Sequence, residues 1–269
     1  MQPTDDTKPP DACRVLCTGD WHGDKSTAGF ARFDDVTGSA RRAAQLAVEL
    51  RCDWFGFLGD LTDPDTNGAH RCVEFAIELL DWLLARGVSS FWFVGNHDAV
   101  EDEAGTSALD ALAAHVRSRP RSAALAGARV FSEPGLLDLA PGVLLVVLPH
   151  PHRGKPYDPA AWLTSLAWKG AAHRSVLVAG HLLVDAYERP ELRGSESLDM
   201  PRGRLGSFPV ETCRALWGER AVLVNGHYHR AHGAADPVLV PGSLERLTRA
   251  EAGYEPRVLV LDLPAGGAS

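Results

Sequence analysis

Short apolar runs that end in polar residues recur along the first third of the chain. Three such runs predict buried β-strands: "RVLCTGD" (14–20), "DWFGFLGD" (53–60) and "VSSFWFVGN" (88–96). The segments between them, 40–50 and 70–87, place apolar residues on one helical face, and Gly87 suits the left-handed position that ends a helix. Strands that alternate with helices predict an α/β sheet with helices packed on its faces.

The second half of the chain is richer in strands. Residues 128–149 are broken at Pro-Gly pairs, which is typical of antiparallel strands. "RSVLVAGH" (174–181) and "RAVLVNGH" (220–227) are short Val/Leu strands that we expect to be buried, and both end in Gly-His. Residues 237–247 and 256–264 predict the last strands. The whole pattern predicts a mixed α/β (α+β) sandwich.

Composition favours one soluble globular domain. The 269 residues are 45% hydrophobic, and we expect a disordered polar tail (1–12), a single domain (13–265) and no separate capping domain. We find no secretion signal or membrane span, so a cytoplasmic location is expected. A net charge of -8 argues against a broad basic face for nucleic acid, although bound cations would change the field locally. Five cysteines without a CxxC pair favour free thiols.

The polar residues at the strand ends are of metal-ligand type. In open α/β sheets ligands bind beyond the carboxyl ends of the strands, where eight such residues are expected to meet. They are Asp20, His22, Asp60, Asn96, His97, His181, His227 and His229. Oxygen and nitrogen ligands without thiolate suit Mn²⁺, Fe²⁺ or Zn²⁺. Their number exceeds what one ion takes from protein, which indicates two ions that share a carboxylate.

The order of the motifs resembles that of the calcineurin-like metallophosphoesterases. The motifs are "GDWHGD", "GDLTD", "GNHD", Gly-His and "GHYH", between residues 19 and 229. The resemblance implies a four-layer fold, with two mixed β-sheets flanked by helices. It also implies a ligand set for two metals: Asp20, His22 and His229 for the first, Asp60 as the bridge, and Asn96, His181 and His227 for the second. His97 would point at the phosphate.

Two ions of this kind would bind a phosphate oxygen and lower the pKa of a bridging water to give hydroxide. We expect Mn²⁺, with Fe²⁺, Zn²⁺ or Mg²⁺ as alternatives. His97 would stabilise the transition state or protonate the leaving oxygen, and the neighbouring Asp98 would orient it.

The later segments resemble the SbcD/Mre11-type DNA exonucleases within this family. The cues are "VVLPHPHRG", "SFPVETCRAL" and "GHYHRAH" followed by "PGSLER". The resemblance implies a DNA substrate and an SMC-like ATPase partner, and it leaves the oligomeric state open. Two departures would argue against processive duplex digestion: we expect no capping domain after the catalytic core, and Asp63 stands near a position where some relatives carry a His.

Several alternatives stay open at this point. The substrate could instead be a cyclic nucleotide or another small phosphate diester, and a non-catalytic metal-binding adaptor is a third interpretation. Side chains near the motifs have two interpretations each, one functional and one structural. These are Trp21 (base stacking or packing), Asp24 and Asp63 (support of the site or turn formation), His150 and His152 (substrate contact or loop), and Arg189, Arg193, Arg202 and Arg204 (phosphate track or solvated loop).

Overall fold

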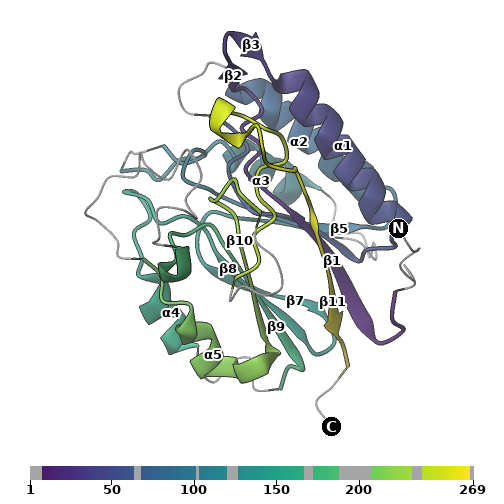
Figure 1. The fold of residues 1–269 in the computed structure, drawn as a ribbon. Coiled ribbons are helices and arrows are strands. Elements are labelled where there is room, and N and C mark those ends of the chain that lie inside the picture. Colours follow the sequence, from purple (N-terminus) through teal and green to yellow (C-terminus); the bar gives the residue numbers. More distant parts are fainter. Residues whose placement is uncertain are drawn as a thin grey trace.

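The computed structural model describes residues 8–63, 68–100, 103–119, 127–166, 172–187, 207–231 and 238–266. Two β-sheets face each other, and helices cover the outer face of each sheet (Figure 1). The predicted four-layer sandwich of mixed sheets is confirmed.

The first sheet has the strand order β11-β1-β4-β5-β6. Its strands are β11 (Leu259–Pro264), β1 (Ala12–Thr18), β4 (Trp54–Phe57), β5 (Ser89–Phe93) and β6 (Ala128–Phe131). β11 pairs antiparallel with β1, and the other neighbours are parallel. Three helices pack on its outer face: α1 (Phe33–Glu49), α2 (Ala69–Leu84) and α3 (Asp110–Ser118).

The second sheet has the order β10-β9-β8-β7. Its strands are β10 (Ala221–Asn225), β9 (Ser175–Gly180), β8 (Val143–Leu148) and β7 (Gly135–Ala140), and only β7 is antiparallel to its neighbour. Its outer face carries α4 (Pro159–Ser165) and α5 (Glu211–Trp217). The remaining elements are a hairpin, β2 (Ser26–Thr27) with β3 (Phe30–Ala31), and the short turns η1 (Asp185–Tyr187), η3 (Gly218–Arg220) and η4 (Arg249–Glu251).

Alternation along the strands builds three separate layers of core. In β5, Phe91 and Phe93 face the second sheet, whereas Trp92 between them packs under the helices of the first. Successive side chains of a strand point to opposite faces, so a strand buried on both sides is apolar throughout. This explains why the sequence of each buried strand is a continuous apolar run that stops where the strand ends.

Two strand predictions need correction. Residues 128–149 do not form antiparallel pairs throughout, because β6 joins β5 in parallel and only β7 and β8 form a hairpin. The Pro134–Gly135 pair therefore carries the chain from one sheet to the other. In the described part of 237–247, Leu239 forms an isolated β-bridge to Val224, and these residues do not form the longer strand that was predicted.

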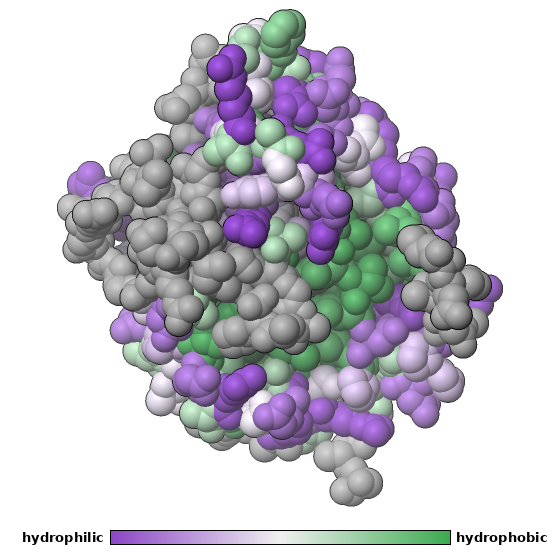
Figure 2. Space-filling view, viewed as in Figure 1, coloured by the Kyte–Doolittle hydropathy of each residue, from purple (hydrophilic) through white to green (hydrophobic). Residues whose placement is uncertain are grey.

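The ends of the domain lie next to each other. β1 begins at Ala12, opposite Pro264 of β11, and Lys8 Nζ lies 2.5 Å from Asp53 Oδ2. Figure 2 shows an apolar area over β1 and β11, where Val260 is 38% exposed. Residues 1–7 of the predicted tail lie outside the described residues, as do 188–206 with the four loop arginines.

The five cysteines are free and buried, as expected. Among the described residues, no helix is long and apolar enough to cross a membrane.

Candidate metal centre

The predicted ligands meet at one edge of the sandwich. Asp20 and His22 follow β1, Asp60 follows β4, and Asn96 and His97 follow β5. From the second sheet, His181 follows β9, and His227 and His229 follow β10. These strands are parallel within each sheet, so their carboxyl ends open on the same side, and all seven predicted ligands lie together there.

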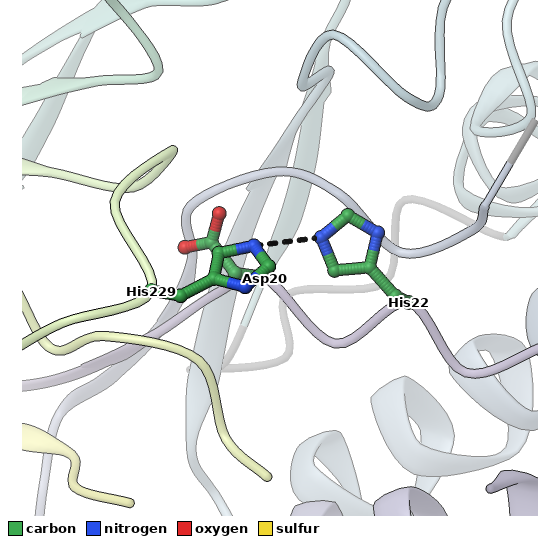
Figure 3. Close-up of side chains that lie close together, drawn as sticks. All are labelled: Asp20, His22 and His229. Carbon is green, nitrogen blue, oxygen red and sulfur yellow. Dashed lines mark hydrogen bonds between the residues drawn. The ribbon is translucent and has the colours of Figure 1, made fainter. Parts of the chain in front are cut away.

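The first group consists of Asp20, His22 and His229. One ligand atom of each lies within 4.8 Å of the others, and the three side chains converge in Figure 3. His22 Nε2 and His229 Nε2 are 3.2 Å apart. Metal–imidazole bonds of about 2.0–2.1 Å would let both nitrogens reach one shared ion across that distance. The group therefore fits a divalent cation.

Asp60 stands between two histidines that come from different sheets. Its Oδ2 lies 3.6 Å from His22 Nε2 and 3.2 Å from His181 Nε2, while its Oδ1 accepts the His97 backbone N–H over 2.9 Å. A carboxylate with an imidazole on either side is placed to serve two ions at once. This is the arrangement expected of the bridging ligand.

The second group gathers around Asn96. Its Oδ1 lies 2.9 Å from His181 Nε2 and 3.0 Å from His227 Nδ1. His181 Nδ1 lies 2.7 Å from Leu58 O and donates to that carbonyl, which leaves Nε2 as the ligand nitrogen. His227 Nε2 is buried and has no hydrogen-bond partner within the described part of the chain. An amide oxygen and two imidazoles also fit a divalent ion.

Strained backbone places these ligands. Asp20, His22, Asp60 and His227 have φ values of 52°, 43°, 59° and 73°. A non-glycine residue in the left-handed region costs of order 1–3 kcal/mol, and such residues concentrate at functional sites. The loops thus accept strain to aim their side chains at the site.

The charges of the site depend on each other. Burial would raise the pKa of Asp60, but the His181 imidazole, followed by His22, outweighs burial and holds that pKa well below its usual value. Burial lowers the pKa of His181, yet the charge and hydrogen bond of Asp60 raise it to about 9. Burial and the neighbouring His181 keep the pKa of His227 well below normal, so His227 is neutral, the form that binds metal.

Comparison with known proteins agrees with this geometry. The sequence profile of the calcineurin-like phosphoesterases matches residues 13–231. The chain belongs to this family. It is therefore a metal-dependent phosphoesterase, a hydrolase of ester bonds. No curated protein sequence matches the chain.

Solved structures share the fold of this phosphoesterase at low sequence identity. A dimetal phosphatase from Danio rerio is 12% identical, with a TM-score of 0.55, over 93% of this chain and 92% of that one. The protein TT1561 of Thermus thermophilus is 14% identical, with a TM-score of 0.51, over 93% of this chain and 99% of that one. Both likenesses concern the fold.

His97 lies beside the predicted ligands, with a ring nitrogen within 4.8 Å of ligand atoms of His22 and Asp60. It is half-buried, and its ring stands perpendicular to that of His22 at 4.7 Å between centroids. The position is compatible with a side chain that reaches substrate, and the catalytic role of His97 stays a prediction.

Asp98 has a different role from the one predicted. Its buried carboxylate does not bind the His97 ring; it accepts backbone N–H groups from Asp60, Leu61, Thr62 and Gly95 at 2.8 to 3.2 Å. The Asp98 carboxylate thus ties the turn after β5 to the loop after β4. Burial, then the nearby Asp60 charge, raises the pKa of Asp98 to about 6.

The structure shows contacts for three of the side chains that had both a functional and a structural interpretation. Trp21 is 1% exposed and packs on Phe57 and Trp92, so it is a core residue and does not stack on bases. Asp24 Oδ1 accepts the Asp63 N–H over 2.6 Å, and Asp63 Oδ2 lies 3.0 Å from Lys25 Nζ. These acidic residues support the loop of the site.

The two histidines after β8 differ in position: His150 lies near the metal centre, whereas His152 lies in a turn. The half-buried ring of His150 has its centroid 6.5 Å from that of His181, at the edge of the metal centre. Burial, followed by the His181 charge, lowers the pKa of His150 to about 4. His152 is buried in the adjoining turn, where it bridges to Lys155.

Sequence reasoning missed one residue that contacts a predicted ligand. Glu251, in η4, is fully buried, and its Oε1 lies 2.9 Å from His229 Nδ1. It follows no strand and belongs to no motif, so its position along the chain gave no indication of its place in the fold.

Proposed function

We propose that the protein is a two-metal phosphodiester hydrolase that acts on DNA. The observation that carries the two-metal part is the place of Asp60, whose Oδ2 has His22 on one side and His181 on the other. Asp60 belongs to two clusters of potential ligand atoms, one with His22 and His97 and one with Asp20 and His181, which supports a carboxylate shared between two ions.

In this function the residues of the chain would have separate roles. Asp20, His22, Asp60 and His229 would hold one ion, and Asp60, Asn96, His181 and His227 the other. Bound divalent ions, for which we expect Mn²⁺, supply charge that polarises the phosphate and acidifies water. His97, half-buried beside His22, would protonate the leaving oxygen or stabilise the negative charge that develops on the phosphate.

The position of the "PGSLER" turn supports a DNA substrate. This motif carries part of the resemblance to the exonuclease branch, and it packs against the metal centre. Ser243 N–H donates to His229 O over 3.0 Å, and Ser243 also bridges to Gly19. Arg32, beside the β2–β3 hairpin, donates to Arg246 O over 2.6 Å. These contacts place the motif next to the predicted metal ligands, which is compatible with a role in binding a substrate strand. An ATPase partner stays a prediction.

The test is hydrolysis by the purified full chain after loading with Mn²⁺. Labelled single-stranded, blunt duplex and hairpin DNA are compared with a cyclic nucleotide and bis(p-nitrophenyl) phosphate. His97→Ala serves as the inactive variant. His115→Ala is the matched control, because His115 pairs with Asp81 on the α2–α3 face.

DNA cleavage that disappears in His97→Ala and persists in His115→Ala is the expected result. Hydrolysis of only the small diesters would overturn the DNA assignment and leave a small-molecule phosphodiesterase. Metal binding without turnover of any of these substrates would favour the adaptor interpretation.

A further inference from the structure

Glu251 is a buried carboxylate in a short turn of the C-terminal segment. Its side chain is 0% exposed, and its contacts include His229 Nδ1 at 2.9 Å from Oε1, Thr248 Oγ1 at 3.1 Å from Oε1, and Leu247 N at 2.7 Å from Oε2. Removing a carboxylate from water costs several kcal/mol unless hydrogen bonds compensate. Here that compensation comes in part from a predicted metal ligand, His229.

We propose that Glu251 is a positioning residue for the first metal site, acting through His229. A carboxylate accepts, so His229 Nδ1 donates to Glu251 Oε1, and the lone pair of the neutral imidazole then lies on Nε2. That Nε2 is the atom that faces His22 Nε2 at 3.2 Å. Glu251 therefore selects both the tautomer and the direction in which His229 presents its ligand nitrogen. The inference rests on the proposed two-ion site.

The other two contacts of Glu251 hold the carboxylate itself in place. The backbone N–H of Leu247 fixes Oε2, and the hydroxyl of Thr248 fixes Oε1 beside His229. The His229 imidazole thus donates to a carboxylate that is already oriented by the turn that carries Glu251. Metal-binding histidines commonly donate their second nitrogen to such an acceptor, and its loss typically lowers metal affinity about 10- to 100-fold.

Glu251 lies beyond the part of the chain that the family profile matches, which ends at residue 231. The support of His229 is therefore supplied by this chain's own C-terminal segment. The same segment offers a matched control. Glu245 accepts from Ser39 Oγ, and its Oε2 lies 3.5 Å from Arg32 Nη2; neither partner is a predicted ligand.

The experiment measures metal binding and does not depend on turnover. Full-length wild type, Glu251→Gln and Glu245→Gln are stripped with EDTA, and their thermal midpoints are compared to confirm folding. Mn²⁺ affinity and stoichiometry are then determined by calorimetry and by electron paramagnetic resonance. We expect Glu251→Gln to bind one of the two ions about 10- to 100-fold more weakly and the other unchanged, because only the first group contains His229. Glu245→Gln changes no contact to a predicted ligand and should match wild type in Mn²⁺ affinity and stoichiometry.

Equal affinities for both ions in Glu251→Gln and wild type would overturn the positioning role while leaving the two-metal function intact. A wild type that binds no Mn²⁺ would overturn both. If Glu251→Gln fails to fold without metal, Thr248→Val removes only the hydroxyl that holds Oε1. That variant should weaken the same ion several-fold, and an unchanged affinity there would also overturn the proposal.

Discussion

The backbone N–H of Asp60 donates to Asp98 Oδ2 over 2.8 Å, so a second buried carboxylate holds the loop that carries the predicted bridging ligand. Asp98→Ala would leave the buried N–H groups of Asp60, Leu61 and Gly95 without this acceptor. Each buried group left unsatisfied costs about 1–3 kcal/mol, so the free energy of unfolding should fall by about 3 kcal/mol or more. Urea titration of the EDTA-treated protein measures the loss.

Asp158→Ala is the control for that measurement. Asp158 also accepts two backbone N–H groups, but it caps the exposed start of α4. Its removal should cost about 1 kcal/mol. Equal losses in the two variants would contradict the anchoring role of Asp98.

His97→Ala should separate catalysis from metal binding. The contact of His97 with Asp60 uses its backbone N–H, which alanine retains. We expect turnover to fall by about 10²–10⁴-fold, as for loss of a general acid, with ion stoichiometry unchanged. Steady-state rates and elemental analysis of the same samples test this. Loss of an ion together with activity would show His97 to be a ligand.

Metal affinity should depend on pH through His181. Because Asp60 raises the pKa of His181 to about 9, the metal-free protein carries a proton there at neutral pH. An incoming ion must displace that proton, so affinity should fall by up to about tenfold per pH unit as pH drops below 9. His227 should not contribute to this pH dependence of the metal affinity, since its pKa lies well below the usual value. Mn²⁺ titrations at pH 6, 7 and 8 provide the measurement, and a flat profile would count against this coupling.

Gly226 should not tolerate a side chain. A Cβ there would lie 2.5 Å from Leu58 O and 2.9 Å from His181 Nδ1, the two atoms that form the bond orienting His181. Gly226→Ala should therefore lose metal affinity and activity at least about tenfold and destabilise the fold by about 1–3 kcal/mol. Gly38→Ala in α1 meets no atom within 4 Å and should stabilise by about 0.5–1 kcal/mol. Comparable effects of the two substitutions would refute this account.

The thiols should be inert in the folded protein. Burial raises the pKa of Cys17 and Cys213 to about 12, and that of the other three cysteines is also raised. At pH 8 we expect no reaction with an aromatic disulfide reagent in buffer and five thiols in denaturant. Rapid labelling of the native protein would indicate an opening of the core.

That the predicted ligands lie together could be foreseen from the sequence because each follows an apolar strand. Parallel strands bring their carboxyl ends to one edge of a sheet, so Asp20 could be placed near Asp60 and Asn96, and His181 near His227. Strand direction alone does not bring the two sheets together; that step came from the resemblance of the motif order to the family.

Contacts that depend on turn geometry could not be predicted in this way. Asp98 adjoins His97 in sequence, yet the turn sends its carboxylate back to the Asp60 loop. Glu251 reaches His229 from a 3₁₀ turn that has no periodic pattern. The pairing of β6 with the first sheet could not be predicted either, because an apolar strand next to Pro-Gly fits either sheet equally well.

His22 and His229 meet across 207 residues of sequence, and β1 closes against β11, the last strand described. Such distant contacts form late in folding, because the intervening chain must first be ordered. While the protein is still being made on the ribosome, Asp20, His22 and Asp60 have emerged but lack His227, His229 and Glu251. The nascent chain cannot yet assemble either of the two predicted ligand sets. Metal acquisition, and with it the ability to cut phosphoesters, would therefore begin only after synthesis has passed these C-terminal residues.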